Sequence, residues 1–174
     1  MSSSVRTAAT LTTLALLVVL GAAWGWSAFT KPLPKGSVGG EQAEAPVCVD
    51  KDIEAGTTVY RNEVTVSVYN AGGRSGAAGT TMQLLAEAGF AEGKMGNAPR
   101  GTDVRFVRIW ADDPDNPAVR LVASHLGDPV VRPSEGLDAP GVIVLVGNDF
   151  AGLTKGRKKI VAEQDTSFCS PVID

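Results

Sequence analysis

The hydrophobic positions of the chain follow two different periods within one stretch, residues 64–90. Valine alternates with polar residues at positions 64, 66 and 68, which is the period of a strand with one face in a core. A glycine-rich turn follows, and from Ala77 to Ala88 the apolar residues recur three and four positions apart before Gly89. This order predicts a strand, a loop and a helix that ends at a glycine.

A second stretch repeats this plan between residues 104 and 127. Apolar residues and arginines alternate in residues 104–110, which indicates a half-buried strand. Asn116 followed by Pro117 predicts the start of a helix, because asparagine caps helices and proline fits their first position. The apolar positions continue to Leu126, and Gly127 ends the predicted helix.

Three shorter segments complete the predicted fold. Residues 91–102 are mostly small and polar, which indicates a loop with room for a short edge strand. Residues 130–131 indicate a short strand, and the run VIVLV at residues 142–146 indicates a central strand buried on both faces. We therefore expect a single α/β domain with a mixed sheet and at least two helices, built from repeated strand-loop-helix units.

The N-terminal segment is apolar and carries no charge between residues 7 and 30. It is long enough to cross a hydrocarbon core of roughly 30 Å as a helix, and Trp24, Trp26 and Phe29 stand where an interfacial aromatic belt would lie. Residues 1–30 are therefore predicted to be a cytoplasmic stub and a transmembrane anchor. The alternative is a cleaved signal peptide, with the small residues 21–23 as its cleavage site.

Both interpretations place the rest of the chain outside the cytoplasm. Residues 31–46 are rich in proline and glycine without apolar periodicity, which is typical of a flexible linker. Residues 47–174 are predicted to form the extracytoplasmic domain. The expected location is the cell membrane, crossed once, so the cytoplasmic membrane itself is a predicted partner through the N-terminal helix.

Two cysteines, Cys48 and Cys169, stand at the two edges of the predicted domain. In an exported chain such a pair indicates a disulfide bond; the alternative is two free thiols. Together with a single histidine, His125, they are too few for a structural zinc site, which usually needs four such ligands. We expect no resident metal and no cofactor.

The charge of the chain argues against nucleic acid as a partner. Sixteen basic residues face nineteen acidic ones, for a net charge of −3, whereas phosphate neutralisation needs a basic face. Spacing assembles no acid–base pair, and nucleophile–histidine chemistry would have to run through His125. The sequence therefore predicts a protein that is not an enzyme.

The strongest candidate site is the turn after the first predicted strand. Glycine-rich turns that lead into helices present backbone N–H groups and a positive dipole end to anions, and an arginine here adds a charge. The alternative is an ordinary turn in which Gly72 and Gly73 adopt positive φ and Ser75 caps the helix. The candidate ligand-binding residues are Asn70, Gly72, Gly73, Arg74, Ser75 and Gly76.

Three further features allow a functional or a structural interpretation. Asp112, Asp113 and Asp115 offer the oxygen ligands that calcium prefers, but helix capping and the helix dipole also account for acidic residues at this place. His125 is read as a structural histidine rather than a catalyst. The basic run from Lys155 to Lys159 suits contact with anionic lipid or wall polymer, although such runs are also found simply solvated.

Several of these segments together resemble a known family. VTVSVYNAGGRSGAAGTTMQLLAEAGF, a helix that ends in His-Leu-Gly, and VIVLVGNDF are similar to the LytR C-terminal domain over residues 64–153. In that family the domain often follows a phosphotransferase that attaches glycopolymers to the cell wall, and no such catalytic domain is recognised here. The layout of anchor, linker and domain with flanking cysteines is similar to that of small actinobacterial envelope-integrity proteins.

The resemblance implies a function in the cell envelope. It suggests a non-catalytic, membrane-anchored extracytoplasmic module that supports envelope integrity by binding a protein or an envelope component. The alternative is a carrier that binds a phosphorylated polyprenyl lipid or a wall glycopolymer, held by residues 70–76. The expected partners are accordingly an envelope protein or an anionic lipid or glycopolymer.

Overall fold

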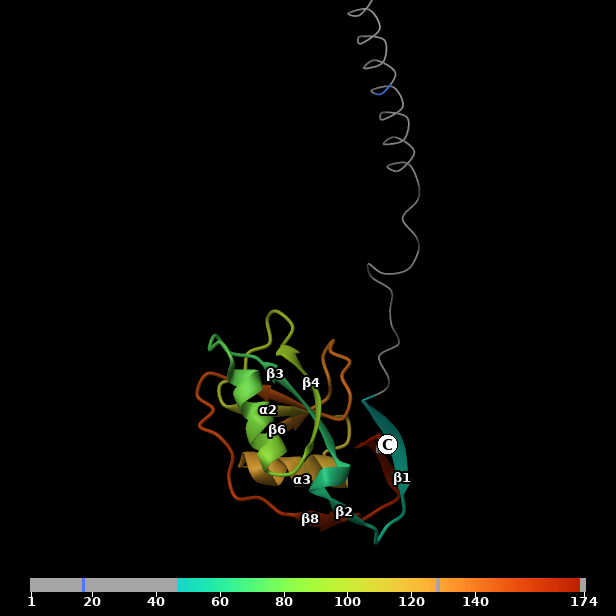
Figure 1. Ribbon diagram of the computed structural model, residues 1–174. Helices are drawn as coiled ribbons and strands as arrows, with labels where there is room; N and C mark the ends of the chain where they lie inside the picture. The colour runs from blue at the N-terminus through green and yellow to red at the C-terminus, as the bar shows by residue number, and fades with distance from the viewer. Residues whose placement is uncertain (1–16, 18–46, 128, 173–174) are drawn as a thin grey trace, which may run out of the picture. The chain divides into compact units, whose positions relative to one another are not determined.

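The computed structural model describes residue 17 and residues 47–127 and 129–172 (Figure 1). The predicted anchor at residues 1–30 and the linker at residues 31–46 therefore lie outside the described residues, apart from Leu17. In the described part of the chain, none of the helices has both the length and the apolar character needed to cross a membrane.

The core of the domain is a five-stranded mixed sheet with the order β4-β3-β7-β5-β6. β3 is parallel to both β4 and β7, whereas β5 is antiparallel to β7 and parallel to β6. The strands are β3 (Thr65–Asn70), β4 (Ala91–Asn97), β5 (Val107–Trp110), β6 (Val130–Arg132) and β7 (Val142–Val146). The predicted mixed sheet is confirmed, and so is the central position of residues 142–146.

Each of the two predicted strand-loop-helix units continues into a neighbouring parallel strand. The first unit runs through β3, α2 (Ala77–Glu87) and β4; the second runs through β5, α3 (Pro117–Leu126) and β6. Because β3 and β5 run in opposite directions on the two sides of β7, the units point in opposite directions. Both helices pack on the same face of the sheet (Figure 1).

The two faces of the sheet are buried in different ways. Along β3 and β7 the side chains of Val66, Val68, Val142, Val144 and Val146 belong to the core under the helices. The intervening side chains point to the opposite face, where residues of the connecting loops pack against them. Tyr69, Val104, Trp110, Ile143 and Leu145 form this second cluster. The alternation of side chains along a strand thus fills two cores, and β3 and β7 are buried on both sides.

The start and end of α3 follow the sequence-based prediction. The Asn116 side chain accepts a hydrogen bond from the backbone N–H of Ala118 at 3.0 Å, and Pro117 occupies the first helical position. Gly127 ends the helix with φ of 78°, a left-handed conformation that glycine adopts without steric cost.

Two boundaries differ from the prediction. The segment predicted as a loop with a short edge strand contains the seven-residue strand β4, which pairs with β3 although its sequence is small and polar. The strand predicted at residues 104–110 covers only Val107–Trp110. Before it, Phe106 and Arg105 accept hydrogen bonds from Gly147 and Asp149, so this segment crosses the end of β7 instead of continuing the regular ladder.

Two small antiparallel pairs lie outside the central sheet and were not predicted. β1 (Cys48–Ile53) pairs with β9 (Thr166–Pro171), and β2 (Thr58–Tyr60) pairs with β8 (Lys159–Val161) (Figure 1). A short 3-10 helix, η1 (Arg61–Glu63), connects β2 to β3. Most residues of β1 are exposed, so this strand lacks the apolar run or alternation by which strands are recognised in sequence.

Candidate functional site

The loop between β3 and α2 is held together mainly by its own polar groups. The Oδ1 atom of Asn70 accepts a hydrogen bond from the Gly72 backbone N–H at 3.0 Å, and its Nδ2 atom donates to the Arg74 carbonyl at 2.8 Å. The Gly73 N–H donates to Oδ1 of Asn148, in the loop after β7, at 2.7 Å. Two N–H groups that the sequence offered to an anion are therefore already used within the protein.

Two details of the predicted turn are wrong. Gly72 and Gly73 do not have positive φ; the left-handed residue of this loop is Gly76, with φ of 79°. Ser75 does not cap the helix, because Gly76 is the N-cap residue and no side chain caps α2. Gly72 has a different reason to be glycine: a Cβ atom there would collide with Asn148.

The second half of the loop borders a small cavity of about 190 Å³. Arg74, Ser75 and Gly76 lie on its wall, whereas Asn70, Gly72 and Gly73 do not. The wall is completed by the first turns of α2 and by residues 150–152. The Arg74 Nη2 atom donates to the Phe150 carbonyl at 3.3 Å, and the first turn of α2 contains no acidic residue. The amide groups at an uncapped helix start favour an anion.

A larger cavity of about 510 Å³ lies between the β1–β9 pair and the central sheet. It is bordered by the first residues of β3, β7 and α3 and by the last residue of β5. Its apolar wall contains Trp110, Val119, Pro140, Val142 and Phe168. Cavities of this volume with apolar walls and a few polar groups are the usual form of ligand sites.

The polar groups of this larger cavity carry negative rather than positive charge. Asp50 and Asp138 are exposed carboxylates in its lining, and among the described residues this lining contains no lysine or arginine. Asn116 is held by hydrogen bonds from its Nδ2 to the Ser167 carbonyl at 2.8 Å and to Thr166 Oγ1 at 3.1 Å. The buried Oγ1 atom of Thr65 has no hydrogen-bond partner among the described residues. The cavity therefore favours neutral or cationic groups over anions.

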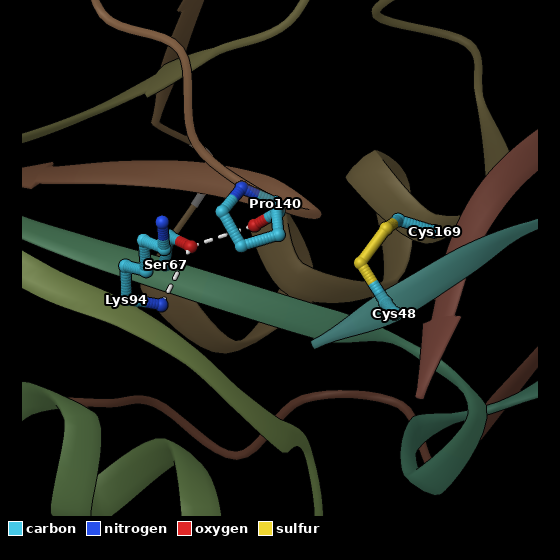
Figure 2. The surroundings of a disulfide bond; sticks show 5 residues. All are labelled: Cys48, Ser67, Lys94, Pro140 and Cys169. Atoms are coloured by element: carbon cyan, nitrogen blue, oxygen red, sulfur yellow. Dashed lines mark hydrogen bonds between the residues drawn. A yellow bond between two sulfur atoms is a disulfide. The ribbon is translucent and has the colours of Figure 1, made fainter. Parts of the chain in front are cut away.

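The predicted disulfide is confirmed, and it forms part of the wall of this cavity. Cys48 in β1 and Cys169 in β9 are bonded across 121 residues of sequence, with their Cα atoms 5.4 Å apart. Figure 2 shows the bond together with Pro140, which lines the same cavity as Cys169 and whose carbonyl accepts a hydrogen bond from Ser67 Oγ at 2.6 Å. Ser67 Oγ in turn accepts from the Lys94 backbone N–H at 3.0 Å. The disulfide and Ser67 thus tie the strands and the loop around the cavity together.

The three acidic residues before α3 do not assemble a metal site. Asp113 Oδ1 accepts a hydrogen bond from the Asp115 backbone N–H at 2.9 Å, and the cap of the helix is Asn116. None of Asp112, Asp113 and Asp115 lies in the first turn of α3. Within residues 47–127 and 129–172, no group of three or more His, Cys, Asp or Glu side chains is placed to hold a metal ion.

His125 has a packing role in the structure. Its side chain is only 4% exposed, and its ring meets that of Phe90 edge to face with centroids 5.1 Å apart. Its Nε2 atom lies 2.9 Å from the Arg157 carbonyl oxygen, and Gly156 lies so close to the ring that a Cβ atom would overlap it. His125 therefore fixes the segment that leads into β8.

The larger cavity was not found by sequence reasoning. Its lining comes from separate segments between Asp50 and Cys169, and no short sequence motif contains them. The available signal was the cysteine pair, which brings β1 to β9 and so places two of these segments side by side. The position of Val142 at the start of the predicted central strand gives no further sign of a cavity.

Comparison with known proteins gives a family for the chain. No curated protein matches it. Among solved structures it is similar to the soluble domain of a conserved hypothetical secreted protein from Mycobacterium marinum, with 19% identity, a TM-score of 0.44, and coverage of 64% of this chain and 79% of that one. Residues 63–150, half of the chain, match the sequence profile described as LytR cell envelope-related transcriptional attenuator. The chain therefore belongs to the LytR_C family.

Proposed function

We propose that this protein is a non-catalytic binding module of the cell envelope. Residues 1–30 anchor it in the cytoplasmic membrane, and residues 47–174 lie outside the cytoplasm, where they support envelope integrity by binding another envelope protein. Membership of a cell envelope-related family and the disulfide bond, which persists in oxidising compartments, support this location.

The observation that carries the proposal is the cavity of about 510 Å³ beside the disulfide. Its apolar wall accepts an apolar side chain of a partner, and Asp50 and Asp138 attract a basic residue next to it. Cys169 in this lining is bonded to Cys48 and is therefore not available as a thiol nucleophile. Binding is therefore a better account of the site than catalysis.

The proposal is tested by crosslinking in cells. A photo-crosslinking residue at Asp138, on the rim, is expected to capture an envelope protein. The variant Ala111→Phe, which fills the cavity from its wall, should abolish the adduct and should fail to restore resistance to envelope stress in a deletion strain. A crosslinker at the exposed Arg100, outside the cavity lining, is the control. Equal capture and equal rescue by Ala111→Phe would show that the cavity is not used.

The anchor is tested separately from the cavity. Membranes washed with alkaline carbonate are expected to retain the protein, and its mass should include residues 1–30. Release by the wash, with a mass that lacks the N-terminal segment, would favour the cleaved signal peptide instead.

A second function is favoured by one specific observation, the cavity of about 190 Å³ at Arg74 and the uncapped start of α2. This space suits the phosphate of a phosphorylated polyprenyl lipid or of a wall glycopolymer, while the rest of such a ligand would lie on the surface. In this case the protein is a carrier. Arg74→Ala should weaken the binding of polyprenyl phosphate to the purified full chain, and Arg100→Ala should not. Unchanged binding by Arg74→Ala would remove this alternative.

A further inference from the structure

The β2–β8 pair lies at one end of the domain (Figure 1), and a groove with basic residues in its lining lies beside this pair. The register of this pair places Tyr60 opposite Lys159. Together with Arg61 and Asn62 of η1, Lys158, and Gly89 of the turn after α2, these residues line a groove of about 460 Å³. Residues nearly one hundred positions apart in sequence therefore form one surface. Of the predicted basic run, Lys158 and Lys159 belong to this lining, whereas Lys155 and Arg157 do not.

The positive charges of the groove are not neutralised inside the protein. Its lining contains no carboxylate, and within the described residues Arg61, Lys158 and Lys159 take part in no ion pair. The carboxylate nearest to Arg61 in sequence, Glu63, forms its ion pair with Lys51, whose Nζ donates to it at 2.6 Å, and it also accepts from the Tyr60 backbone N–H at 2.8 Å. In a chain with net charge −3, this is a local concentration of positive charge that attracts anions.

The groove also contains an exposed aromatic ring. Tyr60 is 46% exposed, and the Nζ atom of Lys159 lies 5.8 Å from the centre of its ring. An aromatic face packs well against the C–H face of a sugar ring, and the phenol hydroxyl and the Asn62 amide provide hydrogen-bonding groups beside it. A flat anionic membrane surface would not fit as well into a concave groove as a single polymer chain does.

We infer that this groove binds an anionic polysaccharide, a chain of sugar residues that carry carboxylate or phosphodiester groups. The sugar ring stacks on Tyr60, and its acidic groups contact Arg61, Lys158 and Lys159. Five of the six lining residues lie outside residues 63–150, the segment that matches the family profile. The groove shares no lining residue with the cavity beside the disulfide, and the inference is independent of the proposed function.

The test measures binding of the full 174-residue chain, purified in a neutral detergent, to four probes. Polygalacturonate is a sugar chain with carboxylates, polyphosphate is a polyanion without sugars, dextran is a neutral sugar chain, and phosphatidylglycerol vesicles present an anionic membrane. We expect binding to polygalacturonate that weakens with added salt, and none to dextran. Binding to the vesicles alone would overturn the inference in favour of a membrane surface.

Two double variants distinguish binding in the groove from non-specific electrostatic attraction to the whole protein. The double variant Lys158→Gln/Lys159→Gln should weaken polygalacturonate binding by roughly 25-fold, from about fivefold for each charge near an anionic surface. Arg100→Gln/Arg132→Gln removes the same charge from two exposed residues outside the groove and should change binding by less than about twofold. An equal loss in both variants would show non-specific attraction and overturn the site. Thermal unfolding confirms that all variants are folded.

The role of the sugar is tested at Tyr60. Tyr60→Ala should weaken the binding of polygalacturonate by roughly tenfold, as expected for loss of one aromatic stacking contact, and leave polyphosphate binding nearly unchanged. Tyr60→Phe keeps the ring and should bind polygalacturonate like the wild type. If Tyr60→Ala weakens both polymers equally, or neither, the groove does not recognise a sugar and the inference is wrong.

Discussion

Gly72 lies so close to Asn148 that no side chain fits between them. A Cβ atom at position 72 would be 2.6 Å from Asn148 Oδ1 and 2.8 Å from its backbone nitrogen. Asn148 is itself fixed, because its Oδ1 accepts the hydrogen bond from the Gly73 N–H at 2.7 Å. The loops that follow the parallel strands β3 and β7 are therefore locked together where both strands end.

This contact predicts that alanine substitution destabilises the fold at Gly72 but not at the neighbouring Gly73. Gly72→Ala should lower the free energy of unfolding by about 1–3 kcal/mol, since overpacking forces the two loops apart. Gly73→Ala is the matched control: its Cβ would lie 3.8 Å from Asn148 Oδ1, an ordinary contact, so the expected change is less than about 0.5 kcal/mol. Urea unfolding measures both values. Equal stabilities for the two variants would contradict the tight contact.

Two buried hydroxyl groups on β3 differ in their hydrogen bonds. Ser67 Oγ donates to the Pro140 carbonyl and accepts from the Lys94 backbone N–H, whereas Thr65 Oγ1 has no partner among the described residues. Ser67→Ala should therefore lower the free energy of unfolding by about 1–3 kcal/mol, because it removes two hydrogen bonds at a buried position. The quantity to measure is again the midpoint of urea unfolding.

Thr65→Val serves as the comparison, since it keeps the shape of the side chain and removes a buried hydroxyl that makes no hydrogen bond to the described residues. It should leave the stability unchanged or raise it by up to about 1 kcal/mol. The backbone of Gly141 packs closely against Thr65, so the residue at position 65 must keep its shape, and valine does. A clear loss of stability in Thr65→Val would mean that the hydroxyl has a partner, for example a bound water molecule.

The disulfide is expected to contribute strongly to stability. It connects residues 121 positions apart, and in the chain-entropy model a loop of this length constrains the unfolded chain by about 4–5 kcal/mol. Reduction, or the double variant Cys48→Ala/Cys169→Ala, should lower the unfolding midpoint accordingly. Free-thiol titration of the denatured, unreduced protein provides the control and should find no reactive thiol. The same stability with and without reductant would contradict this role.

The centre of the sheet, β3 and β7, was predictable because these two strands carry their own sequence signal. Residues 142–146 are apolar at every position and buried at every position, and the valines of β3 alternate as a strand requires. Asn116, Pro117 and Gly127 determine the ends of α3 by local geometry, which depends on neighbouring residues only. By contrast, β1 and β8 are mostly exposed, and their pairing depends on distant partners.

The candidate sites also depend on contacts between residues that are distant in sequence, and they were therefore harder to predict. Gly72 is glycine because of Asn148, 76 positions later, and the turn sequence alone suggested positive φ instead. The basic groove is formed by Arg61 and Lys158, which lie near opposite ends of the domain's sequence but side by side in the fold. Long-range contacts of this kind have no local pattern, so the sequence could propose residues 70–76 as a site but not show which of their N–H groups remain available.

Glu63 predicts how stability depends on pH. Partial burial raises the pKa of Glu63, but the hydrogen bonds from Lys51 and from the Tyr60 backbone, together with the charge of Lys51, outweigh burial and bring the pKa below its ordinary value of 4.5. A lowered pKa in the folded state means that the unfolded chain binds the proton more readily. The contribution of the charged Glu63 carboxylate to stability is therefore complete above about pH 4.5, and it is lost as the pH falls through the pKa of the folded state. Because the Glu63 side chain is 24% exposed, we expect this contribution to the free energy of unfolding to be less than about 1 kcal/mol.

Urea unfolding between pH 6 and pH 3 should show a shallower loss of stability in Glu63→Gln than in the wild type, while the exposed Glu135→Gln keeps the wild-type slope. Parallel curves for wild type and Glu63→Gln would mean that Lys51 and Tyr60 do not favour the charged carboxylate.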